Sequence, residues 1–271
     1  RRYLDDIVIV AENRVQFLQR VNAVLGTLWY FNFRLKGKKM SLLGKTVELL
    51  GKTLCDGKIF PSKHVVRNIN DRIWENITTK RQLKSFIGCV SYISDHLPNQ
   101  ADFLHKLRDA SNGTLADRVD WTDELKKELD LVKKECSNLM TLHPVIPDQE
   151  LFMVVDSSIF ATGMLLYQWD PSNKKRKRFV KIFSRRRSAT DNKFAISSCR
   201  CELNGIVVGM MASQVEIALC TKKVIIFTDS MPVAHLYKRL RDTGTPSTDR
   251  VLNDAFAKLM IFHYEIQYLS N

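Results

Sequence analysis

Two apolar runs that each end in an aspartate constrain the fold of this chain more than any other feature. Residues 151–155 lead into Asp156, and residues 224–228 lead into Asp229. Short apolar runs bounded by turn residues are typical of buried strands. A carboxylate at the end of a central strand is unfavourable unless it is hydrogen-bonded or neutralised by a metal ion. The two aspartates therefore raise the hypothesis of a metal site.

A third acid, Glu202, lies between these runs in a segment with helical spacing of apolar residues. Seen in isolation, a helical glutamate is more often exposed and without a special role. Here Glu202 follows Asp156 by 46 residues, which is room for two more strands and the start of a helix, and it precedes Asp229 by 27 residues. We therefore expect four strands in this part of the chain, at residues 151–155, 164–168, 179–184 and 222–228.

Four stretches of this segment, residues 155–158, 163–168, 201–203 and 227–230, resemble the ribonuclease H domain of a retroelement polymerase. The resemblance implies an α/β fold in which helices flank a mixed five-stranded sheet. It also implies that the acids at positions 156, 202 and 229 are catalytic and bind metal. In that family such acids hold two Mg²⁺ ions, with Mn²⁺ as the alternative ion, and hydrolyse the RNA of an RNA/DNA hybrid.

A second pair of acids, Asp5 and Asp6, lies between Tyr3 and the apolar residues 7–10. Most adjacent aspartates are only turn residues. In this setting residues 3–6 resemble the Tyr-x-Asp-Asp motif of reverse transcriptases. The resemblance implies that Asp5 and Asp6 are catalytic and bind Mg²⁺ for DNA synthesis, with Asp5 the more direct ligand, and that Tyr3 contacts nucleic acid.

Later features follow in the order that the same family shows. The turn at Gly51, followed by Gly57 and Pro61, resembles the hairpin that grips the primer, although both glycines are equally compatible with ordinary turns. The helical residues 81–92 resemble the thumb helix, whose basic side chains contact the phosphates of the template–primer duplex. The alternative is a solvated basic face. The corresponding binding candidates here are Gly51, Lys80, Arg81 and Lys84.

The overall charge indicates a polyanionic partner, because 42 basic and 29 acidic residues give a net charge of +13. Two basic clusters, residues 174–178 and 185–187, flank the strand expected at residues 179–184. They suit the backbone of a hybrid duplex, while solvated loops and a nuclear-import signal are the alternatives. The binding candidates in these clusters are Lys175, Arg176, Arg178, Arg185 and Arg186.

Prolines 144 and 147 mark the clearest domain boundary. We expect a reverse transcriptase palm remnant of α+β type at residues 1–61, a helical thumb or connection-like region at residues 62–145, and the ribonuclease H-like domain at residues 146–271. Six cysteines without zinc-site spacing are expected to be reduced thiols of an intracellular protein. Apolar spacing and turn residues predict helices at residues 15–30, 62–69, 78–98, 101–110, 122–140, 231–240 and 248–263, and a last strand at residues 264–269.

Both predicted active sites lack an acid that the family carries, so we expect the chain to be a fragment. A further palm aspartate would precede residue 1, and a fourth ribonuclease H aspartate would follow residue 271. Cys199-Arg200-Cys201 also replaces the acid that is usual just before the catalytic glutamate. The main alternative is therefore a catalytically inactive, nucleic-acid-binding remnant of a retroelement. A host ribonuclease H with an unrelated basic N-terminal region is a weaker alternative.

The resemblance also implies the partners. They are RNA/DNA hybrids and template–primer duplexes, deoxynucleoside triphosphates for the full-length enzyme, and the remainder of a Pol polyprotein. We expect an intracellular location, in a cytoplasmic retroelement particle or the nucleus. No membrane partner is expected, because no apolar run approaches the roughly 18 residues of a membrane span.

Overall fold

The computed structural model describes residues 2–3, 6–41, 44–98, 104–187 and 197–269. The chain divides into two compact units, residues 1–44 and residues 45–271. The predicted domain boundaries after residues 61 and 145 stay predictions.

The first unit contains a short hairpin and one long helix. Strands β1 (Arg2–Tyr3) and β2 (Asp6–Ile7) pair antiparallel. Helix α1 (Arg14–Tyr30) begins at Asn13, whose side chain accepts a hydrogen bond from the Gln16 backbone at 2.9 Å. This confirms the helix predicted at residues 15–30. A 3₁₀ turn, η1 (Gly37–Lys39), follows.

The second unit begins with a three-stranded antiparallel sheet of β3 (Thr46–Leu49), β4 (Lys52–Cys55) and β5 (Lys58–Pro61). Helices follow, and the side chains of Ser62, Thr79 and Thr122 cap three of them by accepting backbone hydrogen bonds. Phe86 is the largest fully buried side chain of the hydrophobic cluster that these helices enclose. The elements are α2 (Lys63–Asn70), η2 (Trp74–Asn76), α3 (Lys80–Tyr92), η3 (Ser94–His96), α5 (His105–Ala110) and α6 (Asp123–Cys136).

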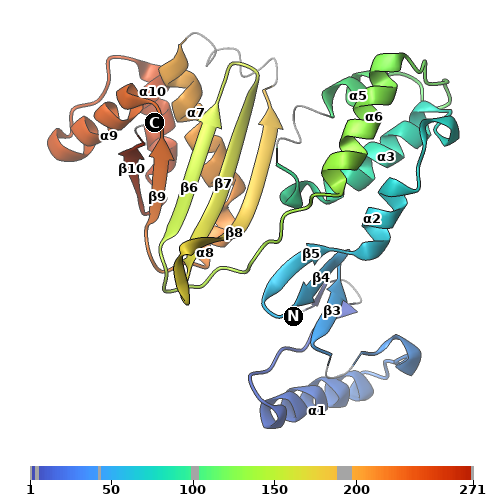
Figure 1. Ribbon diagram of the computed structural model, residues 1–271. Coiled ribbons are helices and arrows are strands. Elements are labelled where there is room, and N and C mark those ends of the chain that lie inside the picture. Colours follow the sequence, from blue (N-terminus) through green and yellow to red (C-terminus); the bar gives the residue numbers. More distant parts are fainter. Residues whose placement is uncertain (1, 4–5, 42–43, 99–103, 188–196, 270–271) are drawn as a thin grey trace. The chain divides into compact units, whose positions relative to one another are not determined.

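A five-stranded mixed sheet forms the C-terminal part of the second unit (Figure 1). The strand order is β10-β9-β6-β7-β8, with β6, β9 and β10 parallel to one another and β7 antiparallel to both of its neighbours. This confirms the α/β class and the mixed sheet. The strands are β6 (Leu151–Ser157), β7 (Ala161–Asp170), β8 (Asn173–Arg186), β9 (Val224–Thr228) and β10 (Tyr264–Tyr268), and the helices are α7 (Ser198–Ala212), α8 (Gln214–Ala218), α9 (Met231–Thr243) and α10 (Arg250–Leu259).

One face of this sheet is covered by helices. Leu151, Met153 and Val155 alternate with less buried residues along β6 and point into a second hydrophobic cluster. Helix α7 packs against β6 and β7, and α10 packs against α7 (Figure 1). The two clusters share no buried residue, so the helical region and the sheet region each have a core of their own.

Several predicted boundaries were wrong. The hairpin strands β7 and β8 extend beyond residues 164–168 and 179–184, because backbone pairing continues from Ala161 to Asp170 whatever the side chains are. The basic residues 174–178 therefore lie on a strand and not in a loop. Helix α3 ends at Tyr92, ahead of the predicted Pro98, and α6 ends at Cys136. None of the described helices is both long and apolar enough to span a bilayer.

Candidate active site

Asp156 and Asp229 lie at the same end of two neighbouring parallel strands. The register of β6 and β9 pairs Val154 with Phe227, and continuing it by two residues sets Asp156 opposite Asp229. Parallel neighbours are about 4.8 Å apart. Both aspartates are exposed, so two carboxylates face solvent side by side at this end of the sheet.

Glu202 approaches the same end of the sheet from the second turn of α7. Its side chain is only 6% exposed, in contrast to the expectation for an isolated helical glutamate. Burial raises the pKa of Glu202 to about 7, and repulsion from Asp229 and Asp156 contributes to the rise. A hydrogen bond to the Ser157 backbone and the charge of Arg187 act in the opposite direction. The three predicted acids are therefore electrostatically coupled.

One carboxylate oxygen of Glu202 fits a cation site. Oε2 is buried and has no hydrogen-bond partner. A buried, unpaired carboxylate oxygen beside two further carboxylates is unfavourable unless a positive charge joins it. As the side chains now lie, no group of three His, Cys, Asp or Glu among the described residues is placed to hold an ion. The acids thus supply suitable oxygen ligands without being assembled as a finished ligand set.

The close approach of α7 to β6 depends on Gly205, which lies three residues after Glu202. A Cβ atom at this position would lie 2.6 Å from both Cβ and Oγ of Ser157. Ser157 is buried and its hydroxyl pairs with the Thr162 hydroxyl at 2.6 Å, so it has little freedom to move. Glycine therefore sets the distance between the helix that carries Glu202 and the strand that carries Asp156.

Gly205→Ala should destabilise the chain by about 1–3 kcal/mol, because the added methyl group overpacks this contact by more than alanine's helix propensity offsets. Urea unfolding measures the change. Gly88→Ala in α3 is the matched control, because a Cβ there meets nothing within 4 Å and should stabilise the helix slightly. Equal midpoints for the two variants would contradict the assignment.

The segment that contains the three acids is similar in sequence to known proteins. Residues 121–231, which contain all three acids, match the family described as the RNase H-like domain found in reverse transcriptase. The chain is 30% identical over 158 residues to the enzymatic polyprotein of cauliflower mosaic virus (strain NY8153), a match that covers 58% of this chain and 22% of the polyprotein. Residues 121–231 of this chain thus form an RNase H-like region similar to those of reverse transcriptases, and the chain resembles part of a viral polyprotein.

Solved structures share the fold of this chain. A foamy viral protease-reverse transcriptase dRH in complex with double-stranded DNA superimposes with a TM-score of 0.74 at 14% identity, covering 97% of this chain and 44% of that one. The foamy viral protease-reverse transcriptase in complex with an RNA/DNA hybrid gives a TM-score of 0.70 at 16% identity and covers 97% and 34% of the two chains. The chain thus spans less than half of the length of each of these three proteins.

The predicted polymerase residues lie in the first unit of the chain. Asp5 lies outside the described residues. Tyr3 and Asp6 are register partners in the β1–β2 hairpin, which has the antiparallel arrangement that the Tyr-x-Asp-Asp resemblance implies. Their role stays a prediction.

The predicted binding residues around the sheet lie at both ends of β8. Lys175 and Arg176 are exposed near its start, and Arg185 and Arg186 are exposed near its end. Arg178 is half-buried and its Nη1 atom has no partner. The structure therefore places four of these five side chains where a polyanion can reach them.

The predicted binding residues of the helical region are less uniform. Arg81 and Lys84 are exposed on α3, whereas Lys80 is half-buried and forms an ion pair with Asp117 at 3.4 Å. Gly51 has a φ of +63° in the β3–β4 turn, and a Cβ there would collide with the ring of Tyr92. Gly51 thus has a structural reason to be glycine that does not require nucleic acid.

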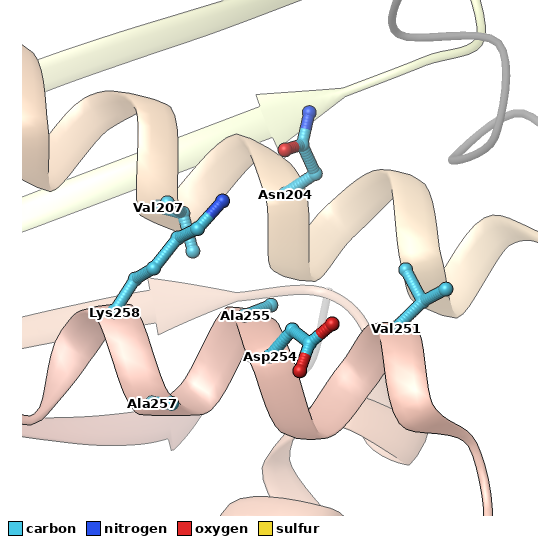
Figure 2. Close-up of a pocket in the computed structure, with 7 residues that line it drawn as sticks. All are labelled: Asn204, Val207, Val251, Asp254, Ala255, Ala257 and Lys258. Atoms are coloured by element: carbon cyan, nitrogen blue, oxygen red, sulfur yellow. The ribbon is translucent and has the colours of Figure 1, made fainter.

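Two other features near the site do not extend the set of acids. Asp249 caps α10 and forms an ion pair with Arg200 at 2.6 Å, so its carboxylate is already used. A cavity of about 310 Å³ lies between the packed helices α7 and α10, and none of the predicted site residues lines it. Figure 2 shows Lys258 reaching across it from α10 towards Val207, and Asp254 pointing into it.

Sequence reasoning missed two residues that shape this site. Gly205 had no signal beyond being a glycine inside a helical pattern, which is a weak cue for close packing. Arg187 was counted only as part of a basic cluster, and nothing in the sequence separates it from Arg185 and Arg186. Its contacts depend on the tertiary structure alone.

Proposed function

We propose that Asp156, Glu202 and Asp229 hold Mg²⁺, two ions in the working site, and hydrolyse the RNA strand of an RNA/DNA hybrid. The observation that supports this most is the buried, unpaired Oε2 of Glu202, coupled in charge to two exposed aspartates at the ends of adjacent parallel strands. Hard divalent cations prefer such oxygen ligands, and Mn²⁺ is the natural substitute.

The side chains of this site have different roles in the proposed reaction. Bound divalent ions supply an activated water and stabilise charge on the leaving oxygen. Asp156 and Asp229 are solvent-facing ligands that a scissile phosphate can approach, while buried Glu202 fixes the inner side of the site. The exposed cations of β8 are suited to contact the duplex backbone and keep the hybrid in register.

The first unit suggests a second activity of the longer protein. Asp5 and Asp6 would bind Mg²⁺ for template-directed DNA synthesis from deoxynucleoside triphosphates, and Arg81 and Lys84 would contact the template–primer duplex. The double-stranded DNA and the RNA/DNA hybrid in the foamy viral complexes support nucleic acid as the partner. Such an enzyme would act inside the cell, in a retroelement particle, alongside the remainder of its polyprotein.

The test is Mg²⁺-dependent cleavage of a labelled RNA/DNA hybrid by this chain. Asp156→Asn should lower the cleavage rate by at least about a hundredfold, because it removes a ligand charge at the reacting phosphate. Hybrid affinity, measured by fluorescence anisotropy, should stay within twofold and fall with salt. Asp130→Asn, an exposed acid on α6, is the matched control. A variant at position 156 that cleaves at the parental rate would contradict the proposal.

The second candidate is a nucleic-acid-binding remnant without catalytic activity. It is favoured by the side-chain positions, in which the described acids are not assembled as a ligand set, and by Cys201 in place of an acid. In that case the parental chain and Asp156→Asn would bind the hybrid equally, and neither would cleave it.

A further inference from the structure

Arg187 follows directly after β8 and lies between the segments that carry two of the acids. Its backbone N–H donates to the carbonyl of Phe160 at 2.8 Å, which fixes it beside the turn between β6 and β7. The side chain is half-buried, unlike the exposed Arg185 and Arg186. Its position in the fold therefore sets it apart from the rest of the basic cluster.

The guanidinium of Arg187 joins the two segments by three hydrogen bonds. Nε donates to the Ser158 carbonyl at 2.7 Å, and Nη2 donates to the Ser157 hydroxyl at 3.0 Å. Nη2 also donates to the Cys201 carbonyl at 2.9 Å. Two acceptors follow Asp156 directly in sequence, and the third directly precedes Glu202.

The remaining guanidinium nitrogen of Arg187, Nη1, lies inside the protein. Nη1 is buried without a partner, as is Oε2 of Glu202. The positive charge of Arg187 acts on Glu202 and opposes the repulsion from the two aspartates. One side chain thus ties the two segments together and supplies positive charge among three negative ones.

We infer that Arg187 is a positioning residue of the carboxylate site, which holds the turn after Asp156 and the first turns of α7 at the spacing that cation binding needs. This inference rests on the proposed function and adds a residue to it. Arg187 acts through the acids and not on the substrate.

Only arginine suits this role. Its planar guanidinium offers five N–H donors in a fixed fork, so one group can serve acceptors on different segments. Lysine would keep the charge but present a single flexible ammonium. Arg187→Lys therefore separates the bridging geometry from the charge, and Arg187→Ala removes both.

The first measurement uses the metal-free chain and does not depend on activity. Amide hydrogen exchange of residues 157–161 and 198–203 should speed up at least about tenfold in Arg187→Lys and Arg187→Ala. Arg118→Lys, an exposed arginine of the helical region, should leave both segments unchanged. Unchanged exchange in both position-187 variants would overturn the inference, whatever the chain does with RNA.

The second measurement follows the cation. Mn²⁺ affinity, read by electron paramagnetic resonance, should fall about 10–100-fold in Arg187→Lys, the range typical for residues that orient metal ligands. In hybrid cleavage, kcat should fall while the KM for the hybrid stays constant, and added guanidinium should restore part of the activity of Arg187→Ala. A raised KM with unchanged kcat would overturn the inference, because it would make Arg187 a nucleic-acid contact.

The two measurements separate this inference from the proposed function. If the parental chain neither binds Mn²⁺ nor cleaves the hybrid, the proposed function fails, and faster exchange in the variants still supports the bridge between the two segments. If the parental chain binds and cleaves while the position-187 variants match it, the proposed function stands and the role of Arg187 fails.

Discussion

Glu202→Gln should raise the free energy of unfolding of the metal-free chain by about 3 kcal/mol at pH 8 while abolishing hybrid cleavage. The pKa of Glu202 rises from 4.5 to about 7 in the folded chain, and each pKa unit corresponds to about 1.4 kcal/mol. Above that pKa the folded chain carries a buried carboxylate beside two others. Glutamine keeps the shape of the side chain and removes this charge.

The raised pKa of Glu202 determines how the stability of the chain changes with pH. The folded chain binds the Glu202 proton more tightly than the unfolded chain, so the free energy of unfolding should fall as pH rises from about 4.5 to about 7. The free energy of unfolding of Glu202→Gln should not show this decrease. Near pH 4.5 the variant and the parental chain should have almost the same free energy of unfolding. Urea unfolding in chelator at pH 4.5, 6 and 8 measures it.

The matched control for this prediction is Glu48→Gln, which neutralises an exposed glutamate of β3. Its free energy of unfolding should stay within about 0.5 kcal/mol of that of the parental chain at every pH. If the free energy of unfolding of Glu202→Gln also had the same pH dependence as that of the parental chain, the charge of Glu202 would not destabilise the folded chain. The opposite effects on stability and cleavage are what a site built from repelling charges predicts.

Phe86→Ala should lower the free energy of unfolding by about 3–5 kcal/mol, because Phe86 is the largest fully buried side chain of the helical cluster. The sheet region has a separate core, so the loss should be local. Amide protection should fall in α3 and α6, whereas β6 and β9 should keep theirs under conditions where the helical region opens. Hydrogen exchange combined with urea unfolding measures both effects.

The control for Phe86 is Phe31→Ala, since Phe31 is 64% exposed. It should change the free energy of unfolding by less than about 0.5 kcal/mol. Equal loss of protection in the helices and in the sheet of Phe86→Ala would show that the two clusters unfold as one unit.

The sheet and the identity of its acids were predictable because both depend on local patterns. Apolar runs ending at Asp156 and Asp229 are visible as runs, and the helix predicted from residue 122 does start there, with Thr122 as its N-cap. The ends of β7 and β8 were not predictable from apolar content, because backbone pairing holds their outer residues and most of the outer residues of β8 are basic.

The burial of Glu202 was not predictable either. It depends on a glycine three residues later that lets α7 contact Ser157, and an arginine directly after β8 bonds to the Cys201 carbonyl beside it. Both effects are tertiary, and neither leaves a spacing signal in a single sequence. The set of acids could thus be predicted, whereas their environment could not.

The position of β8 as an edge strand of the sheet has a consequence for solubility. An edge strand offers unpaired backbone groups to other chains, and charged side chains are a common protection against such edge-to-edge aggregation. The exposed residues 174–177 of β8 supply four positive charges at this edge. Replacing them with alanine would therefore remove protection against aggregation together with any contact to nucleic acid. Glutamate substitutions would repel nucleic acid and still keep the strand from pairing with another chain.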